Sequence, residues 1–128
     1  MPKITSAVVV GLWIAFSGSN ARAQDSAALN SKGAELAKAH CARCHVIDTK
    51  NVFGGISSSP SFPLLVNGLK DWEERMQSFH VRPPHPSIVR FKGETVDPNV
   101  AELRVPVILE YSDIDALVAY VRTLKKGE

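Results

Sequence analysis

The sequence contains little cysteine, little methionine and little net charge. Its 128 residues include two cysteines and two methionines, and 15 basic side chains stand against 13 acidic ones. The only adjacent basic residues are Lys125 and Lys126, which suit the C-terminal end of a helix. The charge pattern therefore does not favour a nucleic-acid partner.

Long apolar runs are also scarce, and the longest one lies near the N-terminus. It covers residues 7–16 (AVVVGLWIAF), whereas a membrane-spanning helix needs about 20 residues. Lys3 precedes this run, and an Ala-x-Ala pattern lies directly before Gln24. These features predict a secretory signal peptide over residues 1–23 that is removed on export, with no stable membrane insertion afterwards. An uncleaved anchor is the alternative.

The rest of the chain, residues 24–128, is long enough for one domain with a single core. Loss of Lys3 and Arg22 with the leader leaves 13 basic and 13 acidic residues, so this domain has almost no net charge. Exported chains normally use cysteine for disulfides. Here the two cysteines are instead close neighbours in the sequence, at Cys41 and Cys44.

These cysteines belong to the pentapeptide CARCH, residues 41–45. In an exported chain, C-x-x-C-H is the signature of covalent haem attachment. Two thiolates at this spacing can add to the two vinyl groups on one porphyrin edge, and the histidine that follows falls beneath the iron. We therefore predict one covalent haem c, with Cys41 and Cys44 as its thioethers and His45 as the proximal iron ligand.

Other uses of the paired cysteines fit the sequence less well. A thioredoxin-type redox pair would need a neighbouring βαβ pattern, which is not apparent, and a disulfide across so short a loop would stabilise little. Zinc is the stronger rival, because Cys41, Cys44, His80 and His85 form a Cys2His2 set. However, 35 residues separate Cys44 from His80, against about 12–15 in the usual pattern. A zinc-binding module is therefore a remote alternative.

The segment before the motif has the composition of a helix. Asn30 or Ser31 is its predicted N-cap, and helix formers follow. Gly33, Ala37 and Cys41 recur every four residues, which gives one face with almost no side chain. Such a face permits another helix to cross closely.

The end of the chain carries the clearest helical pattern. Ser112, with Asp115 three residues later, predicts the helix start as a near capping box. Tyr120 lies beside an apolar stripe at helical spacing. The stripe consists of Ile114, Leu117, Val118, Val121 and Leu124.

A glycine-containing helix that runs into CxxCH, a middle helix and a C-terminal amphipathic helix together resemble small class I (monohaem) c-type cytochromes of the exported bacterial type. The resemblance covers essentially all of residues 24–128. It implies an all-α fold of three to five helices around one covalent haem, with the first and last helices crossed, and Gly33, Ala37 and Tyr120 match the crossing positions. It further implies a periplasmic electron carrier, rather than an enzyme, that docks transiently with redox protein partners.

The middle of the chain is less regular. Residues 48–60 are predicted to be the loop that wraps the haem edge, and residues 61–67 a short helix. Residues 69–79 predict a second, amphipathic helix, and residues 105–109 (VPVIL) an extended segment packed on the domain. The apolar face of the second helix consists of Leu69, Trp72, Met76 and Phe79.

The sixth iron ligand that is usual in the resembled family is missing. Members often carry a pattern like G-H-P-x-M-P, whereas here His-Pro-Ser at 85–87 is followed by Ile88, which cannot bind iron. His85, held between prolines that restrict the backbone, is the tentative distal ligand, with His80 and Met76 as rivals. The remaining possibility is an open site near Ile88, which would make a five-coordinate haem protein that binds small gases or has peroxidase-like activity.

Four further residues near these segments have predicted roles. Trp72 and Arg82 are candidate donors to the haem propionates, with a core aromatic and an exposed charge as the alternatives. His40 is predicted to be a solvated helix residue, and Arg43 to face solvent.

Overall fold

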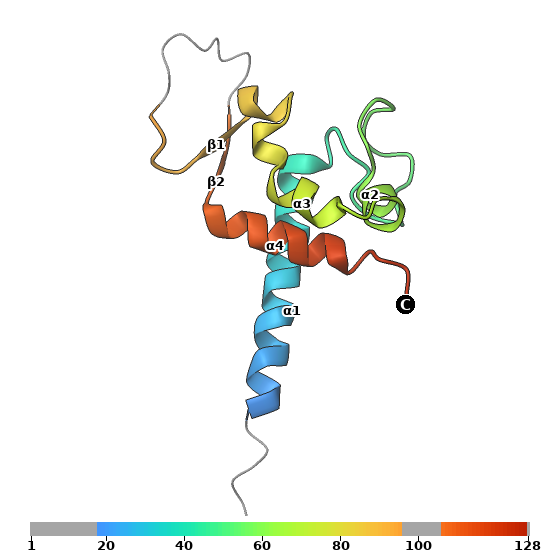
Figure 1. Ribbon diagram of the computed structural model, residues 1–128, viewed down its shortest axis with the longest axis vertical. Helices are drawn as coiled ribbons and strands as arrows, with labels where there is room; N and C mark the ends of the chain where they lie inside the picture. Colours follow the sequence, from blue (N-terminus) through green and yellow to red (C-terminus); the bar gives the residue numbers. More distant parts are fainter. Residues whose placement is uncertain (1–17, 96–105, 128) are drawn as a thin grey trace, which may run out of the picture.

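The computed structural model describes residues 18–95 and 106–127, with side chains from residue 22 onward. Two long helices, α1 and α4, cross each other, and the short helices and strands lie above α4 in Figure 1. The elements in chain order are α1 (Gly18–Leu36), η1 (Ala37–Cys41), α2 (Phe62–Gly68), α3 (Trp72–Gln77), η2 (Phe79–Val81), η3 (His85–Ser87), β1 (Val89–Phe91), β2 (Val107–Leu109) and α4 (Tyr111–Arg122).

The close crossing of the first and last helices is confirmed. A Cβ atom built on Gly33 of α1 would lie 1.9 Å from the backbone oxygen of Ala116 in α4 and 2.7 Å from Cβ of Tyr120. Only a glycine leaves room for this approach. Ala37, four residues further along and the first residue of η1, is also fully buried.

The N-terminal end of α1 differs from the prediction. The helix begins at Gly18 rather than at Asn30 or Ser31, because the intervening Ala- and Leu-containing sequence has no proline or glycine to stop it. The side chains of residues 22–29 are exposed, and this part of α1 extends away from the domain (Figure 1). Residues 1–17 of the predicted signal peptide lie outside the described part of the chain, and none of the described helices is long and apolar enough to cross a membrane.

The start of α4 was predicted two residues too late. Its N-cap is Glu110, and the capping box pairs Glu110 with Asp113 rather than Ser112 with Asp115. The Asp113 carboxylate accepts the Glu110 backbone N–H at 2.8 Å. The predicted apolar stripe does face the core, since four of its members are buried and Leu124 packs against them.

The short helices follow the sequence pattern in part. Ser61 caps α2 as its side chain accepts the backbone N–H of Leu64 at 3.1 Å. The second predicted helix is shorter than expected: α3 ends at Gln77, and the chain tightens into the 3-10 turn η2. Trp72 and Met76 of its predicted apolar face are buried.

A small parallel sheet completes the fold. The segment predicted as extended forms β2, which pairs with β1 in the register Val89 to Val107 and Phe91 to Leu109. β1 was not predicted. Helices still make up most of the regular structure, and residues 48–60 form the predicted loop between the motif and α2.

Candidate functional site

A largely apolar cavity of about 400 Å³ lies between the CxxCH motif and the distal segments. This volume falls in the range of about 300–1,000 Å³ that is usual for ligand sites. Its walls come from nearly every element, so the site exists only in the folded chain. The apolar lining includes Leu36, Phe62, Leu65, Val89, Leu109 and Leu117.

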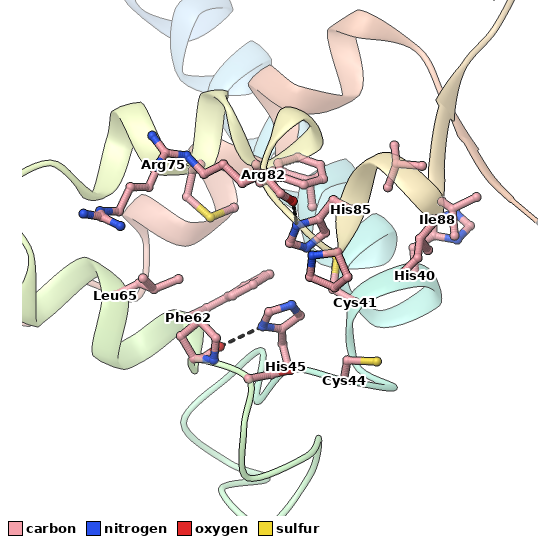
Figure 2. A pocket seen from close by; sticks show the side chains of 18 of the residues that line it. His40, Cys41, Cys44, His45, Phe62, Leu65, Arg75, Arg82, His85 and Ile88 are labelled. Carbon is pink, nitrogen blue, oxygen red and sulfur yellow. Dashed lines mark hydrogen bonds between the residues drawn. The ribbon is translucent and has the colours of Figure 1, made fainter. Parts of the chain in front are cut away.

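The motif residues lie together on one wall of the cavity (Figure 2). The helix widens to a π-turn over η1 just before the motif, and the N–H groups of Cys44 and His45 both donate to the carbonyl oxygen of Cys41, at 3.0 and 2.9 Å. The following loop is tied back to this turn, because Ile56 donates its N–H to the Cys44 carbonyl at 3.0 Å. Gly55 beside it has φ of +73° and lies against the His45 backbone, where a side chain would collide.

His45 presents one ring nitrogen to the cavity. Its Nδ1 atom lies 2.7 Å from the carbonyl oxygen of Pro60 (Figure 2). A carbonyl can only accept, so Nδ1 carries the proton and Nε2 keeps its lone pair. Metal-binding histidines are typically oriented by such a hydrogen bond.

His85 has the same arrangement on another wall. Its Nδ1 donates to the carbonyl oxygen of Arg82 at 3.0 Å, which again leaves the Nε2 lone pair free. The ring centroids of His45 and His85 are 6.0 Å apart, and the ring planes differ by only 10°. Burial lowers the pKa of His85, the Arg82 carbonyl raises it, and nearby His45 lowers it again, with a net lowering that favours the neutral, ligating form.

The two rival ligands, Met76 and His80, and Ile88 of the open-site alternative occupy different places. Met76 lines the cavity and its side chain is buried, and Ile88 also lines it. His80 does not line the cavity; its ring packs edge-on against Phe79 and Phe91.

The cysteine environment argues against a redox thiol pair. Burial, with a smaller contribution from Cys44, raises the pKa of Cys41 to about 11, whereas reactive thiols have lowered values. Both cysteines are free thiols in the protein chain. In residues 18–95 and 106–127, no group of three or more His, Cys, Asp or Glu side chains could hold a metal ion. The Cys2His2 set of the remote zinc alternative is therefore not assembled in these residues.

Two arginines line the largely apolar cavity, in addition to its histidines and serines. Arg82, a candidate propionate donor, is one of them, and Arg75, for which no role was predicted, is the other (Figure 2). The sequence contained one indication of this: Arg75 lies seven residues before Arg82, a spacing that would place both side chains on the same side of a continuous helix. For Trp72 the core-aromatic alternative is confirmed: it is buried in the core beneath the Arg122 guanidinium and does not line the cavity.

Two residues near the motif, His40 and Arg43, were predicted to be exposed to solvent. His40 and Arg43 are both exposed, as expected, and His40 also lines the cavity. The sequence did not indicate Pro60 and Phe62, which contact the His45 ring. Neither contact has a signature in a single sequence.

The donor set and the cavity fit a haem: two thiols, an imidazole with a free Nε2, apolar walls and two guanidinium groups. Comparisons with curated proteins and with solved structures gave no significant match. The sequence does match the Cytochrome c family over residues 31–125. Because this match spans most of the sequence, the chain belongs to the cytochrome c family, and it is a haem-binding electron carrier with covalently attached haem c and redox protein partners.

Proposed function

We propose that the chain is a periplasmic monohaem cytochrome that carries single electrons between redox protein partners, with His45 and His85 as the two axial ligands. A single CxxCH motif supports one haem, since both cysteines are used at Cys41 and Cys44. The haem supplies a reversible one-electron iron couple. The protein holds it, orients its ligands and limits the access of water.

The proposal that His45 and His85 are both iron ligands rests on one observation: the two rings make the same kind of hydrogen bond. Each ring has its Nδ1 bound to a backbone carbonyl, so Nε2 is the nitrogen that remains available to a metal on both. The rings come from opposite sides of one cavity, with centroids 6.0 Å apart. Met76 offers a thioether in the same cavity but sits in the buried face of α3, where core packing accounts for it.

This ligation has a consequence for the redox role. A methionine ligand raises the potential of a haem, whereas a second imidazole is a stronger donor and stabilises ferric iron. We expect a lower potential than that of a histidine/methionine cytochrome. Such a protein accepts electrons only from a correspondingly strong reductant.

The two arginines give the cavity its polar side. Arg75 Nε also donates to Asp71 at 2.9 Å, and Arg82 Nε donates to Ser78 at 3.1 Å. Both guanidinium groups keep further N–H donors, which suit the carboxylates of the haem propionates.

Export is the remaining part of the proposal. Cleavage before Gln24 would remove residues 1–23 and shorten α1, whose exposed N-terminal turns do not contribute to the core. Mass spectrometry of protein recovered from the periplasm tests this: we expect a chain that begins at Gln24 and carries the added mass of one haem. A chain that retains residues 1–23 and fractionates with membranes would support the uncleaved anchor instead.

Substitution of the candidate ligands tests the axial pair. We expect ferric and ferrous spectra of a six-coordinate, low-spin haem in the wild type, and loss of the distal ligand with new CO binding in His85→Ala. His80→Ala is the matched control for ligand loss: His80 lies outside the cavity, so this variant should stay six-coordinate and should not bind CO. Met76→Leu tests the thioether.

Each other outcome has a defined meaning. If Met76→Leu changes the spectra and His85→Ala does not, the distal ligand is Met76. If the untreated ferrous wild type already binds CO, the haem is five-coordinate and the gas-binding or peroxidase-like function replaces simple electron transfer. Haem that is extracted by acid and leaves two free thiols would contradict covalent attachment altogether.

A further inference from the structure

The hydrogen bond on His85 does not by itself determine the plane of its ring. A single bond from Nδ1 to the Arg82 carbonyl fixes one nitrogen, at 3.0 Å, but leaves the ring free to turn about the line that joins the two atoms. A second contact is needed to select one orientation. In the structure the His85 ring lies nearly parallel to the His45 ring, with 10° between the two planes.

Phe79 supplies this second contact. Its ring meets the ring of His85 edge-on, with centroids 5.2 Å apart and planes at 81°. This is the geometry that aromatic pairs prefer. Rotation of the His85 ring out of its plane would lose that contact or collide with the phenyl group.

Phe79 is itself held in place from two directions. It is partly buried, packs against the hydrophobic core and begins the turn η2, in which Arg82 donates its N–H to the Phe79 carbonyl at 2.9 Å. His80 packs edge-on against it at 6.0 Å. The same turn thus fixes both groups that contact the His85 ring, which are the Phe79 phenyl ring and the Arg82 carbonyl.

The proximal side is built in the same way. His45 has the Pro60 carbonyl on Nδ1 and the buried Phe62 ring 5.5 Å away, tilted by 36°. Each imidazole therefore has one backbone acceptor and one phenyl neighbour. On each side, the hydrogen bond fixes one ring nitrogen and the phenyl contact fixes the plane of the imidazole.

We propose that Phe79 is a positioning residue that sets the plane of the His85 imidazole parallel to that of His45. This inference rests on the axial pair proposed above. Its effect is electronic. With haem bound, each imidazole would donate π density perpendicular to its plane. Two parallel rings would then act on the same iron d orbital and separate it from its partner, whereas perpendicular rings would act on different orbitals and leave them close in energy.

Electron paramagnetic resonance of the frozen ferric protein reads this separation directly. We expect a rhombic low-spin signal with three resolved g values for the wild type. Phe79→Leu should move the signal toward the axial type, with an increase in the largest g value, while Phe79→Tyr should restore the wild-type pattern because it keeps the ring. Phe53→Leu is the control, since Phe53 is 97% exposed on the loop after the motif.

The possible failures are distinguishable. A wild-type protein without low-spin ferric iron, or with a thioether ligand, would overturn the axial pair and this inference with it. A low-spin wild type with an axial signal would overturn the positioning role alone, without any variant. Unchanged g values in Phe79→Leu, or an equal change in Phe53→Leu, would also overturn it; Phe79→Met provides a second aliphatic variant if Phe79→Leu does not fold.

Discussion

Gly33 lies where α1 and α4 approach most closely, and it has no space for even one methyl group. The added Cβ of Gly33→Ala would meet the Ala116 backbone oxygen at 1.9 Å, so the helices must separate. We expect the free energy of unfolding to fall by about 1–3 kcal/mol or more, as for other overpacked interiors. Denaturant unfolding of the haem-loaded protein measures it.

Gly68→Ala is the matched control for this substitution. Gly68 also lies in a helix, α2, but a Cβ atom added there would meet no other atom within 4 Å. Its replacement should leave stability unchanged or raise it by about 0.4–1 kcal/mol, because alanine reduces the freedom of the unfolded chain. Equal losses in the two variants would show that the crossing is not the cause.

His80 carries a buried polar atom that the fold does not use. Within the described ranges its Nδ1 atom has no hydrogen-bond partner, and an unsatisfied buried group costs about 1–3 kcal/mol. His80→Phe keeps an aromatic ring between Phe79 and Phe91. We expect unchanged haem spectra and a free energy of unfolding that is unchanged or up to about 1 kcal/mol higher; a clear loss of stability would reveal a partner for this nitrogen.

The sequence could identify the motif residues but not the contacts of Phe79. In an uninterrupted helix, Phe79 would share a face with Trp72 and Met76, as its spacing predicts. Because α3 ends at Gln77 and the chain tightens into η2, Phe79 instead packs edge-on against His85. The end of a short helix depends on its tertiary neighbours, which a spacing pattern does not contain.

At the scale of elements, the α1–α4 crossing is fastened by one buried carboxylate. Asp113 accepts the Glu110 N–H in the capping box and binds Lys32 of α1 at 2.6 Å. Burial raises the pKa of Asp113, but the hydrogen bonds from Lys32 and from the Glu110 backbone lower it by more, so its pKa lies below the usual value of 3.8. The carboxylate therefore contributes stability when it is ionised.

Asp113→Asn should lower the free energy of unfolding by about 1–2 kcal/mol at neutral pH. Since the folded-state pKa is lowered, the Asp113 contribution is complete above the unfolded value of about 3.9 and is lost as pH falls through the folded value. The difference between wild type and variant should therefore shrink below about pH 4. Denaturation curves across this range measure it.

Asp115→Asn is the control on the same helix, because Asp115 is exposed. Surface substitutions of this kind usually change stability by less than about 0.5 kcal/mol. A gap between Asp113→Asn and wild type that does not depend on pH would contradict a role for the ionised carboxylate.

Sequence periodicity located α4 but misplaced its first residue. The stripe from Ile114 to Val121 is a property of the helix itself, so its buried face could be predicted. The first residue of α4 could not be predicted, because its N-cap is Glu110 and glutamate is uncommon at that position. Glu110 acts here with Asp113, whose carboxylate is also held from α1 by Lys32, a non-local contact.

At the scale of the whole molecule, the cavity is continuous with the hydrophobic core, because Phe62, Met76, Leu109 and Leu117 belong to both. Its walls are largely apolar, and apolar surface that stays in contact with water adds nothing to the stability of the fold. Domains of this size have a total stability of about 5–15 kcal/mol. We therefore expect the fold to depend on the prosthetic group that fills the cavity.

Residues 24–128 made in a reducing cytoplasm without haem attachment should show this dependence. We expect near-UV circular dichroism to be lost and thermal unfolding to become non-cooperative, as in a molten globule. The haem-loaded protein measured in parallel is the reference. A haem-free chain that unfolds cooperatively at the same temperature would contradict the prediction.

The sequence by itself determined the attachment motif, the glycine face of α1, the apolar stripe of α4 and the family, because each is a local pattern of residue types at short spacing. Tertiary structure decided which distal side chains share a cavity with His45: Met76 and His85 line it, and His80 does not. The physical reason is that the direction of a side chain in a turn is set by contacts with residues far away in sequence. For His85 these include the ring of His45 on the opposite wall.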